Sequence, residues 1–311
     1  MRSGLQHLRV VVGGGLGDCL LHTPFMRHFR ISGNYSRITC MVPRRALELF
    51  DCNPHIDELI GCDDRGLAIW AAPEVGCDLF SPFVHATVEG SSAAEIRFRP
   101  QFGWKRERPE DSIVSKIARH HGLQLSDESP EVFTAPEDDS WAKSFVQELP
   151  DRPVIVLGRR STARYKQYPA PAWQAVVDDL AAEATLLDFS TEEEAMRGTV
   201  PLSPSLPLRR TAALFRMVHC VATVDSFFGH LAAAVGAVAV VVFGPSSPAV
   251  YGHTGNRNIR VSACPPCFQP EEAGCFQPNC LIGISPSIIV GAVRAVLNRN
   301  ACGLPLTEFA R

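Results

Sequence analysis

The sequence predicts an α/β protein built around two parallel sheets. Apolar runs typical of buried strands alternate with helical patterns twice along the 311 residues, an order that favours sheets covered by helices on both faces. The proline-rich segment 150–153 separates the two series and is the best candidate for a linker. We therefore expect two Rossmann-like domains, residues 1–150 and 151–311, that face an interdomain cleft. Ligands of such sheets bind at the carboxyl ends of the strands.

The composition is that of a globular protein without a strong charge bias. Hydrophobic residues make up 46% and charged residues 20%, which allows a substantial core. The formal net charge of −3 argues against stable binding of nucleic acid. No apolar run reaches the ~20 residues of a membrane span, and no signal-peptide pattern follows Met1. We expect a cytoplasmic protein without a transmembrane segment, for which peripheral membrane association remains open.

Each half of the chain is expected to begin with a buried strand followed by a turn. In the first half, strands are predicted at residues 8–12, 38–42, 58–60 and 78–80, and helices at residues 18–30, 44–50, 112–121 and 137–149. In the second half, strands are predicted at residues 154–157, 185–189, 220–224 and 238–243, and helices at residues 172–182, 211–217, 228–235 and 286–297. Segment 81–109 follows neither pattern, and irregular stretches of this length usually carry function.

The turn after the first strand reads Gly-Gly-Gly-Leu-Gly-Asp over residues 13–18. A dinucleotide-binding fingerprint would have its third glycine where Asp18 stands, and a carboxylate at a helix start would repel a pyrophosphate. Two interpretations of Asp18 remain. It caps the helix, or it is a base that the glycine turn presents to a substrate at the carboxyl end of the strand.

A second motif follows the apolar strand 220–224. Asp225 and Ser226 stand at the carboxyl end of this strand, and a helix of small residues begins directly after them. Unpaired N–H groups at a helix start favour a diphosphate, and His230, about one turn into the helix, is placed to donate to a phosphate. The alternative is a packed core histidine behind two capping residues. The next strand ends in Gly-Pro-Ser-Ser-Pro over residues 244–248, a second turn at the same edge.

Four of the eleven cysteines cluster in a loop, residues 264–280. They are Cys264, Cys267, Cys275 and Cys280. A Cys-x-x-Cys turn stiffened by two prolines and followed by two further cysteines can close a tetrahedral thiolate site for zinc or iron. Free thiols that pack the loop are an equal alternative. A disulfide is a third, which a reducing cytosol disfavours.

Three motifs of the chain occur in a fixed order. The first is Gly-Asp-Cys-Leu-Leu-His-Thr-Pro at residues 17–24, and the second is Ser161-Thr162, followed by Lys-Gln-Tyr-Pro at residues 166–169. The third is Asp225-Ser226 with His-Leu-Ala-Ala-Ala at residues 230–234 and Phe-Gly-Pro-Ser-Ser-Pro. Together they resemble the opening motif, the hydroxyl pair with Lys-x-Trp-Pro, and the donor-site signature of the bacterial heptosyltransferase family. These are the glycosyltransferase family 9 enzymes of GT-B fold that act in lipopolysaccharide biosynthesis.

The resemblance implies an inverting, metal-independent glycosyltransferase that moves heptose from ADP-heptose to a hydroxyl of a glycan, a lipid-linked lipopolysaccharide precursor or a protein. Residues 1–150 would bind the acceptor, and residues 151–311, with the cysteine loop and a closing C-terminal helix, the donor. Asp18 would be the catalytic base, and Lys166 would offset charge on the departing nucleotide. The other donor-binding residues it implies are Ser161, Thr162, Glu192 (at the ribose), Asp225 (at the sugar), Ser226, Gly229 and His230.

The resemblance implies no cofactor for catalysis, and some protein-glycosylating relatives carry a cysteine finger near the position of the cysteine loop. Two residues depart from the family pattern: Phe227 stands where a glycine is usual, and Tyr168 replaces a tryptophan. Two other functions stay open. A nucleotide-sugar epimerase of the same fold would need further acid–base residues, and a catalytically inactive, metal-stabilised interaction module would be consistent with Phe227.

Overall fold

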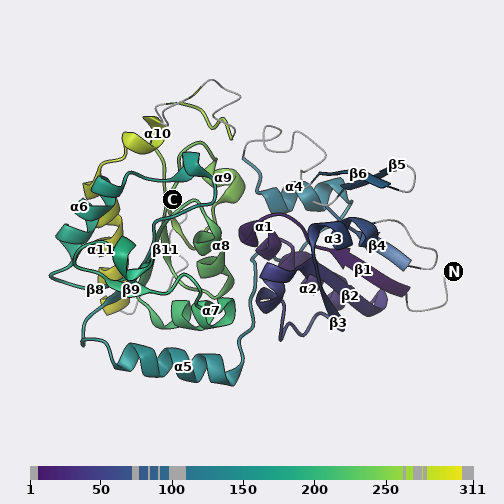
Figure 1. The fold of residues 1–311 in the computed structure, drawn as a ribbon, viewed down its shortest axis with the longest axis horizontal. Coiled ribbons are helices and arrows are strands. Elements are labelled where there is room, and N and C mark those ends of the chain that lie inside the picture. Colours follow the sequence, from purple (N-terminus) through teal and green to yellow (C-terminus); the bar gives the residue numbers. More distant parts are fainter. Residues whose placement is uncertain are drawn as a thin grey trace. The chain divides into compact units, whose positions relative to one another are not determined.

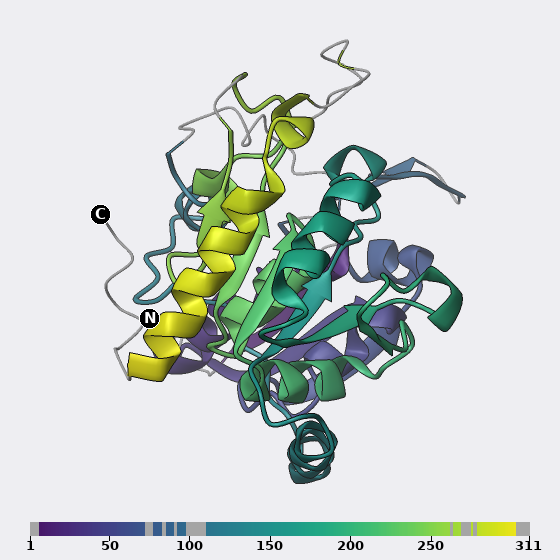
Figure 2. The same cartoon turned by 90° about the vertical axis from the view of Figure 1, so that its left-hand side faces the viewer.

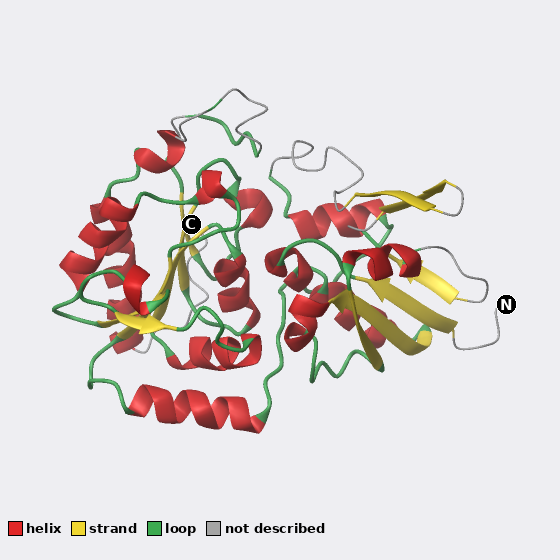
Figure 3. Cartoon of the chain, viewed as in Figure 1, coloured by secondary structure: helices red, strands yellow, loops and turns green. Residues whose placement is uncertain are grey.

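The chain forms two compact units, Met1–Phe133 and Thr134–Arg311, each built around a parallel sheet (Figure 1). The computed structural model describes residues 6–71, 77–82, 85–89, 92–97, 110–261, 264–268, 275 and 279–302. In both units helices flank the strands, as Figure 3 shows. These sheets confirm the predicted α/β class. No helix within the described ranges has the length and apolar character needed to cross a membrane.

The first unit contains a four-stranded sheet in the order β3-β2-β1-β4, and all of its neighbouring strands are parallel. The strands are β1 (Gln6–Val11), β2 (Tyr35–Pro43), β3 (Glu58–Cys62) and β4 (Cys77–Phe80). The helices are α1 (Leu16–Leu20), α2 (Thr23–Ser32), the 3-10 helix η1 (Arg44–Leu49), α3 (Asp64–Trp70) and α4 (Ile113–His120). The central strand β1 is fully buried from Leu8 onward, because helices cover both faces of the sheet.

Two local predictions in this unit were wrong. The helix expected over residues 18–30 is divided into α1 and α2, because Pro24 lacks an N–H and cannot sit inside a continuous helix. The segment 81–109 is not wholly irregular, since β5 (His85–Glu89) and β6 (Ser92–Arg97) pair in an antiparallel hairpin. Residues 83–84, 90–91 and 98–109 of that segment lie outside the described ranges.

The second unit contains a six-stranded sheet in the order β12-β11-β10-β7-β8-β9, again with parallel neighbours. The strands are β7 (Val154–Gly158), β8 (Thr185–Phe189), β9 (Val200–Leu202), β10 (Cys220–Val224), β11 (Ala239–Val242) and β12 (Arg257–Ile259). The helices are α5 (Pro136–Gln147), η2 (Arg164–Lys166), α6 (Ala170–Leu180), η3 (Glu192–Glu194), α7 (Leu208–Met217), α8 (Phe227–Ala234), α9 (Pro248–Tyr251), α10 (Asn279–Ile282) and α11 (Pro286–Cys302). Strands β7 and β10 are buried throughout and lie side by side at the centre.

Helices cover both faces of this second sheet. Figure 2 shows α11 beside α6 across one face, and α7 and α8 pack on the other. On the first face, Trp173 of α6 is 1% exposed and packs edge-to-face against Tyr168. Arg294 of α11 donates a hydrogen bond to Glu183 over 2.8 Å, which fastens the closing helix to the end of the α6 segment. The closing C-terminal helix therefore belongs to the core of the second unit.

The division between the units falls at Phe133, earlier than the predicted boundary after residue 150. Helix α5 belongs to the second unit because Asp138 is buried against α7, where the Arg209 Nε donates to its Oδ2 over 2.9 Å. The proline-rich segment is not a free linker either. Its Arg152 Nε donates to the Thr185 hydroxyl over 3.0 Å, so this stretch is pinned to the sheet.

Candidate functional site

The candidate site begins where β10 ends at the carboxyl edge of the second sheet. The strand delivers Asp225, which is 3% exposed, directly to the start of α8. Ser226 is the residue before the first helical position, in extended conformation, and its hydroxyl lies 3.1 Å from that of Thr223. Gly229 and His230 follow within the first turn and are both buried. The start of α8 therefore lies beside a buried carboxylate.

Lys166 lies beside this carboxylate although it comes from the turn that follows β7. Its ammonium Nζ is 2.7 Å from the Asp225 Oδ2. The lysine side chain is 23% exposed and the aspartate side chain 4%, so the lysine is partly open to solvent and the aspartate is buried. The approach is an ion pair without hydrogen-bond alignment, and Oδ2 has no hydrogen-bond donor in the described part of the chain. This oxygen is itself buried, so the partly exposed ammonium is the group of the pair that a ligand can reach.

A recess of about 170 Å³, part of it open to solvent, lies next to the pair. Its polar lining includes Asp225, Ser226, His230, Tyr251, His253 and Asn258. Much of this volume is open solvent, and the side chains enclose no space as large as a water molecule. The Lys166 ammonium also lies 5.6 Å from the centre of the Tyr251 ring, within reach of a cation–π interaction.

Two histidines meet inside the recess. His230 Nδ1 and His253 Nε2 are 2.9 Å apart, and the rings pack edge-to-face. Burial, and secondarily the neighbouring His230, lowers the pKa of His253 to about 3, so His253 is neutral near pH 7. His230 thus fits both sequence-based interpretations in part, since it is buried and also lines the recess.

The remaining predicted donor residues lie at the same edge of the second sheet. Ser161 and Thr162 are in the turn between β7 and η2, where the Ser161 hydroxyl accepts from the backbone N–H of Ala163 over 3.3 Å. Thr162 is exposed. Glu192 opens the short helix η3 after β8 and is also exposed. Each of these residues therefore follows the strand that the sequence predicted before it.

Asp18 is located in the first unit and caps the short helix α1. Its Oδ2 accepts a hydrogen bond from the Gly15 N–H over 2.9 Å. Gly14 has a φ of +91°, and a Cβ there would lie 2.7 Å from the Asp18 carboxylate, so the turn requires glycine. Arg45 donates to the Gly14 carbonyl over 2.7 Å and holds the turn. The capping contact is thus present, and it engages only one carboxylate oxygen.

Of the two departures from the family pattern, Tyr168 has a local packing explanation, whereas nothing in the structure explains the phenylalanine at position 227. Phe228 packs against Phe189 and Phe215, with ring centres 4.7 and 5.4 Å away. Gly158 makes room for this ring, since a Cβ there would lie 2.3 Å from it. Phe227 is half-buried beside Phe228. Tyr168 is a core residue whose hydroxyl donates to the Ile284 carbonyl over 2.5 Å, so its replacement of tryptophan serves packing.

Two of the four cysteines of the loop, Cys264 and Cys280, are in contact. Cys264 is exposed, Cys267 and Cys275 are half-buried, and Cys280 is buried, and all four are free thiols. Burial, and then the nearby Cys264, raises the pKa of the Cys280 thiol to about 11. Among the described residues, no three His, Cys, Asp or Glu side chains are arranged to hold one metal ion. The predicted metal site therefore gains no geometric support beyond the Cys264–Cys280 contact.

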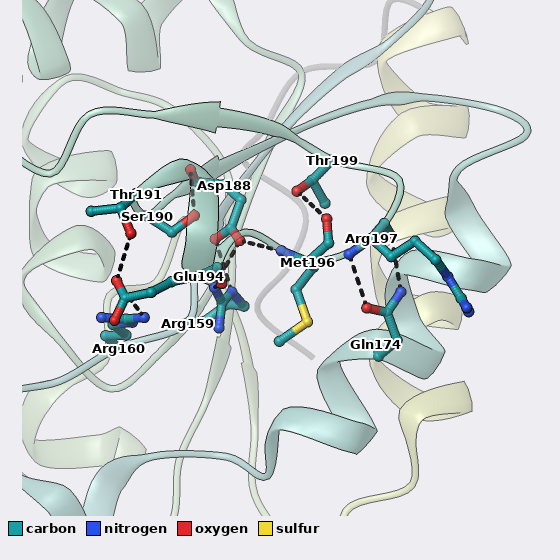
Figure 4. Close-up of polar contacts among 10 residues, drawn as sticks. All are labelled: Arg159, Arg160, Gln174, Asp188, Ser190, Thr191, Glu194, Met196, Arg197 and Thr199. Carbon is teal, nitrogen blue, oxygen red and sulfur yellow. Dashed lines mark hydrogen bonds and ion pairs between the residues drawn. The ribbon is translucent and has the colours of Figure 1, made fainter.

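Sequence reasoning missed a buried ion pair at this edge, shown in Figure 4. Arg159, directly after β7, and Asp188, within β8, form two parallel hydrogen bonds of 2.8 and 2.7 Å. A signal was present, because an aspartate inside the apolar run Leu186-Leu187-Asp188-Phe189 requires a buried partner. Tyr251, His253 and Asn258 of the recess were missed as well, and no sequence pattern marked them.

Comparison with known proteins identifies the family. The family described as glycosyltransferase family 9 (heptosyltransferase) matches residues 113–277. Lipopolysaccharide heptosyltransferase 1 of Pseudomonas aeruginosa is 24% identical over 174 residues, which are 48% of this chain and 49% of that protein. The chain thus spans about half the length of this curated relative.

Solved structures share the fold at low sequence identity. The glycosyl transferase family 9 protein from Veillonella parvula superimposes with a TM-score of 0.74 at 19% identity, covering 96% of this chain and 99% of that chain. ADP-heptose lps heptosyltransferase II of E. coli gives 0.62 at 14%, covering 95% and 100%. The iron-containing dodecameric glycosyltransferase TibC from enterotoxigenic E. coli gives 0.65 at 15%, covering 96% and 78%.

The family match extends over more than half of the chain and includes Ser161, Lys166, Asp225 and His230. The structures that superimpose are GT-B enzymes, which confirms the fold that the motifs predicted. The chain belongs to glycosyltransferase family 9 (heptosyltransferase).

Proposed function

We propose that the protein is an inverting glycosyltransferase that moves heptose from ADP-heptose to an acceptor hydroxyl without a catalytic metal. The observation that carries this proposal is the Lys166–Asp225 ion pair at the start of α8. A diphosphate at this place would meet a cation, a helix N-terminus and the His230 imidazole. The named relatives include an ADP-heptose enzyme and a lipopolysaccharide enzyme, which supports the choice of donor and of a lipopolysaccharide glycan as acceptor. Another lipid-linked glycan or a protein is the alternative acceptor.

The reaction requires one proton transfer and one displacement. The acceptor hydroxyl loses its proton to a base, and its oxygen attacks the anomeric carbon from the face opposite the phosphate. The bond from that carbon to the phosphate oxygen breaks, and ADP departs with the electron pair. In this proposal, Lys166 stabilises the negative charge on ADP, and Asp225, which pairs with the lysine, binds the transferred sugar. Ser161, Thr162, Ser226 and Gly229 complete the proposed phosphate site.

Replacing Lys166 tests the donor site. Lys166→Ala should weaken ADP binding or turnover by about 2–4 kcal/mol, because a preorganised cation facing developing charge is removed. Calorimetry with ADP and ADP release from ADP-heptose measure the two effects. Arg164→Ala, an exposed cation on the same short helix, is the matched control and should behave as wild type. Unchanged kinetics in Lys166→Ala would reject the assignment.

Asp18 is the proposed base, and its capping contact also favours a second function. A residue that only caps α1 would fit the inactive interaction module. The sequence motif favours the base, because a sugar hydroxyl has a pKa far above 7 and needs a proton acceptor at reaction. Replacing Asp18 with asparagine distinguishes the two functions. The amide oxygen can still accept a hydrogen bond from the Gly15 N–H, but the amide cannot act as a base.

Asp18→Asn should keep its melting temperature and ADP affinity while losing ~10²–10⁴ in turnover, because the cap is retained and the base is lost. Asp18→Ala is the companion variant and should lose about 1 kcal/mol of stability in addition. Thermal unfolding and the rate of ADP release are the measurements. Full activity of Asp18→Asn would end the base hypothesis and favour the module.

We also propose a structural zinc or iron ion in the cysteine loop. Its support is the contact between Cys264 and Cys280 and the iron-containing relative of the same fold. Thiolate ligands are those that both metals accept, and such an ion would stabilise the loop without entering the reaction.

Purified protein should contain about one zinc or iron atom per chain, and a chelator should lower its melting temperature, because bound metal stabilises the folded loop. Elemental analysis and thermal unfolding measure both effects. Cys264→Ser should abolish the metal, whereas Cys52→Ser, an exposed cysteine outside the loop, should retain it. Metal-free protein in which all the loop thiols titrate would decide for free thiols.

A further inference from the structure

The carboxylate of Asp188 is fully consumed by internal contacts. It is 0% exposed, its Oδ1 accepts from Arg159 Nε over 2.8 Å, and its Oδ2 accepts from Arg159 Nη2 over 2.7 Å (Figure 4). The backbone N–H of Met196 donates to Oδ2 as well, over 3.0 Å. A carboxylate near the end of the second strand of a Rossmann-like unit often binds a nucleotide ribose. Asp188 cannot, because both of its oxygens are taken.

The ion pair also fastens the far end of the turn of residues 190–196. Asp188 holds the Met196 N–H there, and Arg159 Nη2 donates to the Glu194 carbonyl over 2.9 Å. At the near end, the Ser190 hydroxyl donates to the backbone carbonyl of Asp188 over 3.3 Å. The buried ion pair thus holds the residues through which the turn returns to the sheet.

Within the turn, the three consecutive glutamates have different partners. The Glu194 carboxylate lies 3.0 Å from Arg160 Nη2 and accepts from the Thr191 hydroxyl over 3.2 Å. Glu192 and Glu193 are exposed between the fastened ends. The position of Glu192 is therefore set by groups that do not need to touch a ligand themselves.

We propose that Arg159 and Asp188 are positioning residues that hold the turn of residues 190–196 so that Glu192 meets the ribose hydroxyls of the nucleotide donor. This inference rests on the proposed function, because it needs a nucleotide at this edge. The Arg159–Asp188 ion pair anchors the turn inside the protein. The exposed carboxylate of Glu192, rather than that of Asp188, contacts the ribose. Holding the turn in advance reduces the entropy that donor binding would otherwise have to offset.

Different residues are thus proposed to bind the two halves of the donor. Lys166 and the start of α8 act on the diphosphate, whereas the turn of residues 190–196 acts on the nucleoside. Loosening the turn should therefore weaken the binding of ADP and leave the binding of inorganic pyrophosphate unchanged. Calorimetric titration of the full chain with each of these two probes measures the difference directly.

Arg159→Lys, which keeps the charge but loses the two-pronged contact, should bind ADP about tenfold more weakly, the scale of one hydrogen bond to a charged group. Glu192→Ala should show a similar loss, and the double variant should show no further one, because both changes remove one contact. Binding of pyrophosphate should stay as in wild type in all three. Arg197→Gln is the matched control, since its exposed contact with Asp178 closes no turn, and it should bind ADP normally.

Breaking a buried ion pair can unfold a protein, so thermal unfolding accompanies each titration. If Arg159→Lys is unfolded, Glu194→Gln decides, because it weakens only the exposed contacts with Arg160 and Thr191 and should lower ADP affinity about threefold. Additive losses with Glu192→Ala, equal weakening of pyrophosphate, or unchanged ADP affinity would overturn the inference. Wild-type protein that binds neither probe would instead overturn the proposed function.

Discussion

The ion pair between Lys166 and Asp225 is the interaction on which the candidate site depends. Asp225 is buried because β10 runs through the centre of the sheet and ends inside the protein. A buried carboxylate needs a compensating charge, and the turn after the neighbouring strand β7 supplies it. This requirement brings the turn of residues 161–167 to the start of α8, so the groups that we propose for the diphosphate are assembled before any ligand arrives.

Two buried aspartates at the same edge of the sheet differ in the cation that each one meets. Asp188 meets arginine, whose planar guanidinium satisfies both carboxylate oxygens, and it becomes a structural anchor. Asp225 meets the ammonium of Lys166, a point charge whose side chain is more exposed than that of Arg159. The arginine is therefore enclosed with its aspartate, whereas the lysine remains within reach of a ligand.

Much of the second unit could be predicted from the sequence because its signals are local. The apolar runs of β7 and β10 and the turns after them place Lys166, Asp225 and His230 at one edge without any knowledge of packing. Helix α5 could not be assigned to its unit, because its position depends on the contact of Asp138 with Arg209, far along the chain. The Arg159–Asp188 pair and the His230–His253 contact also join residues from different strands and loops. Such pairings are invisible to periodicity, although a charged residue in an apolar strand signals that a partner exists.

We propose above all that this edge of the second sheet binds the diphosphate of a nucleotide sugar. A crystal structure of the protein with ADP bound would show where the diphosphate lies. We expect a phosphate oxygen within hydrogen-bond distance of Lys166 Nζ, at the start of α8, with the ribose beside the turn of residues 190–196. ADP bound elsewhere on the protein, with Lys166 making no contact to phosphate, would rule out this binding site.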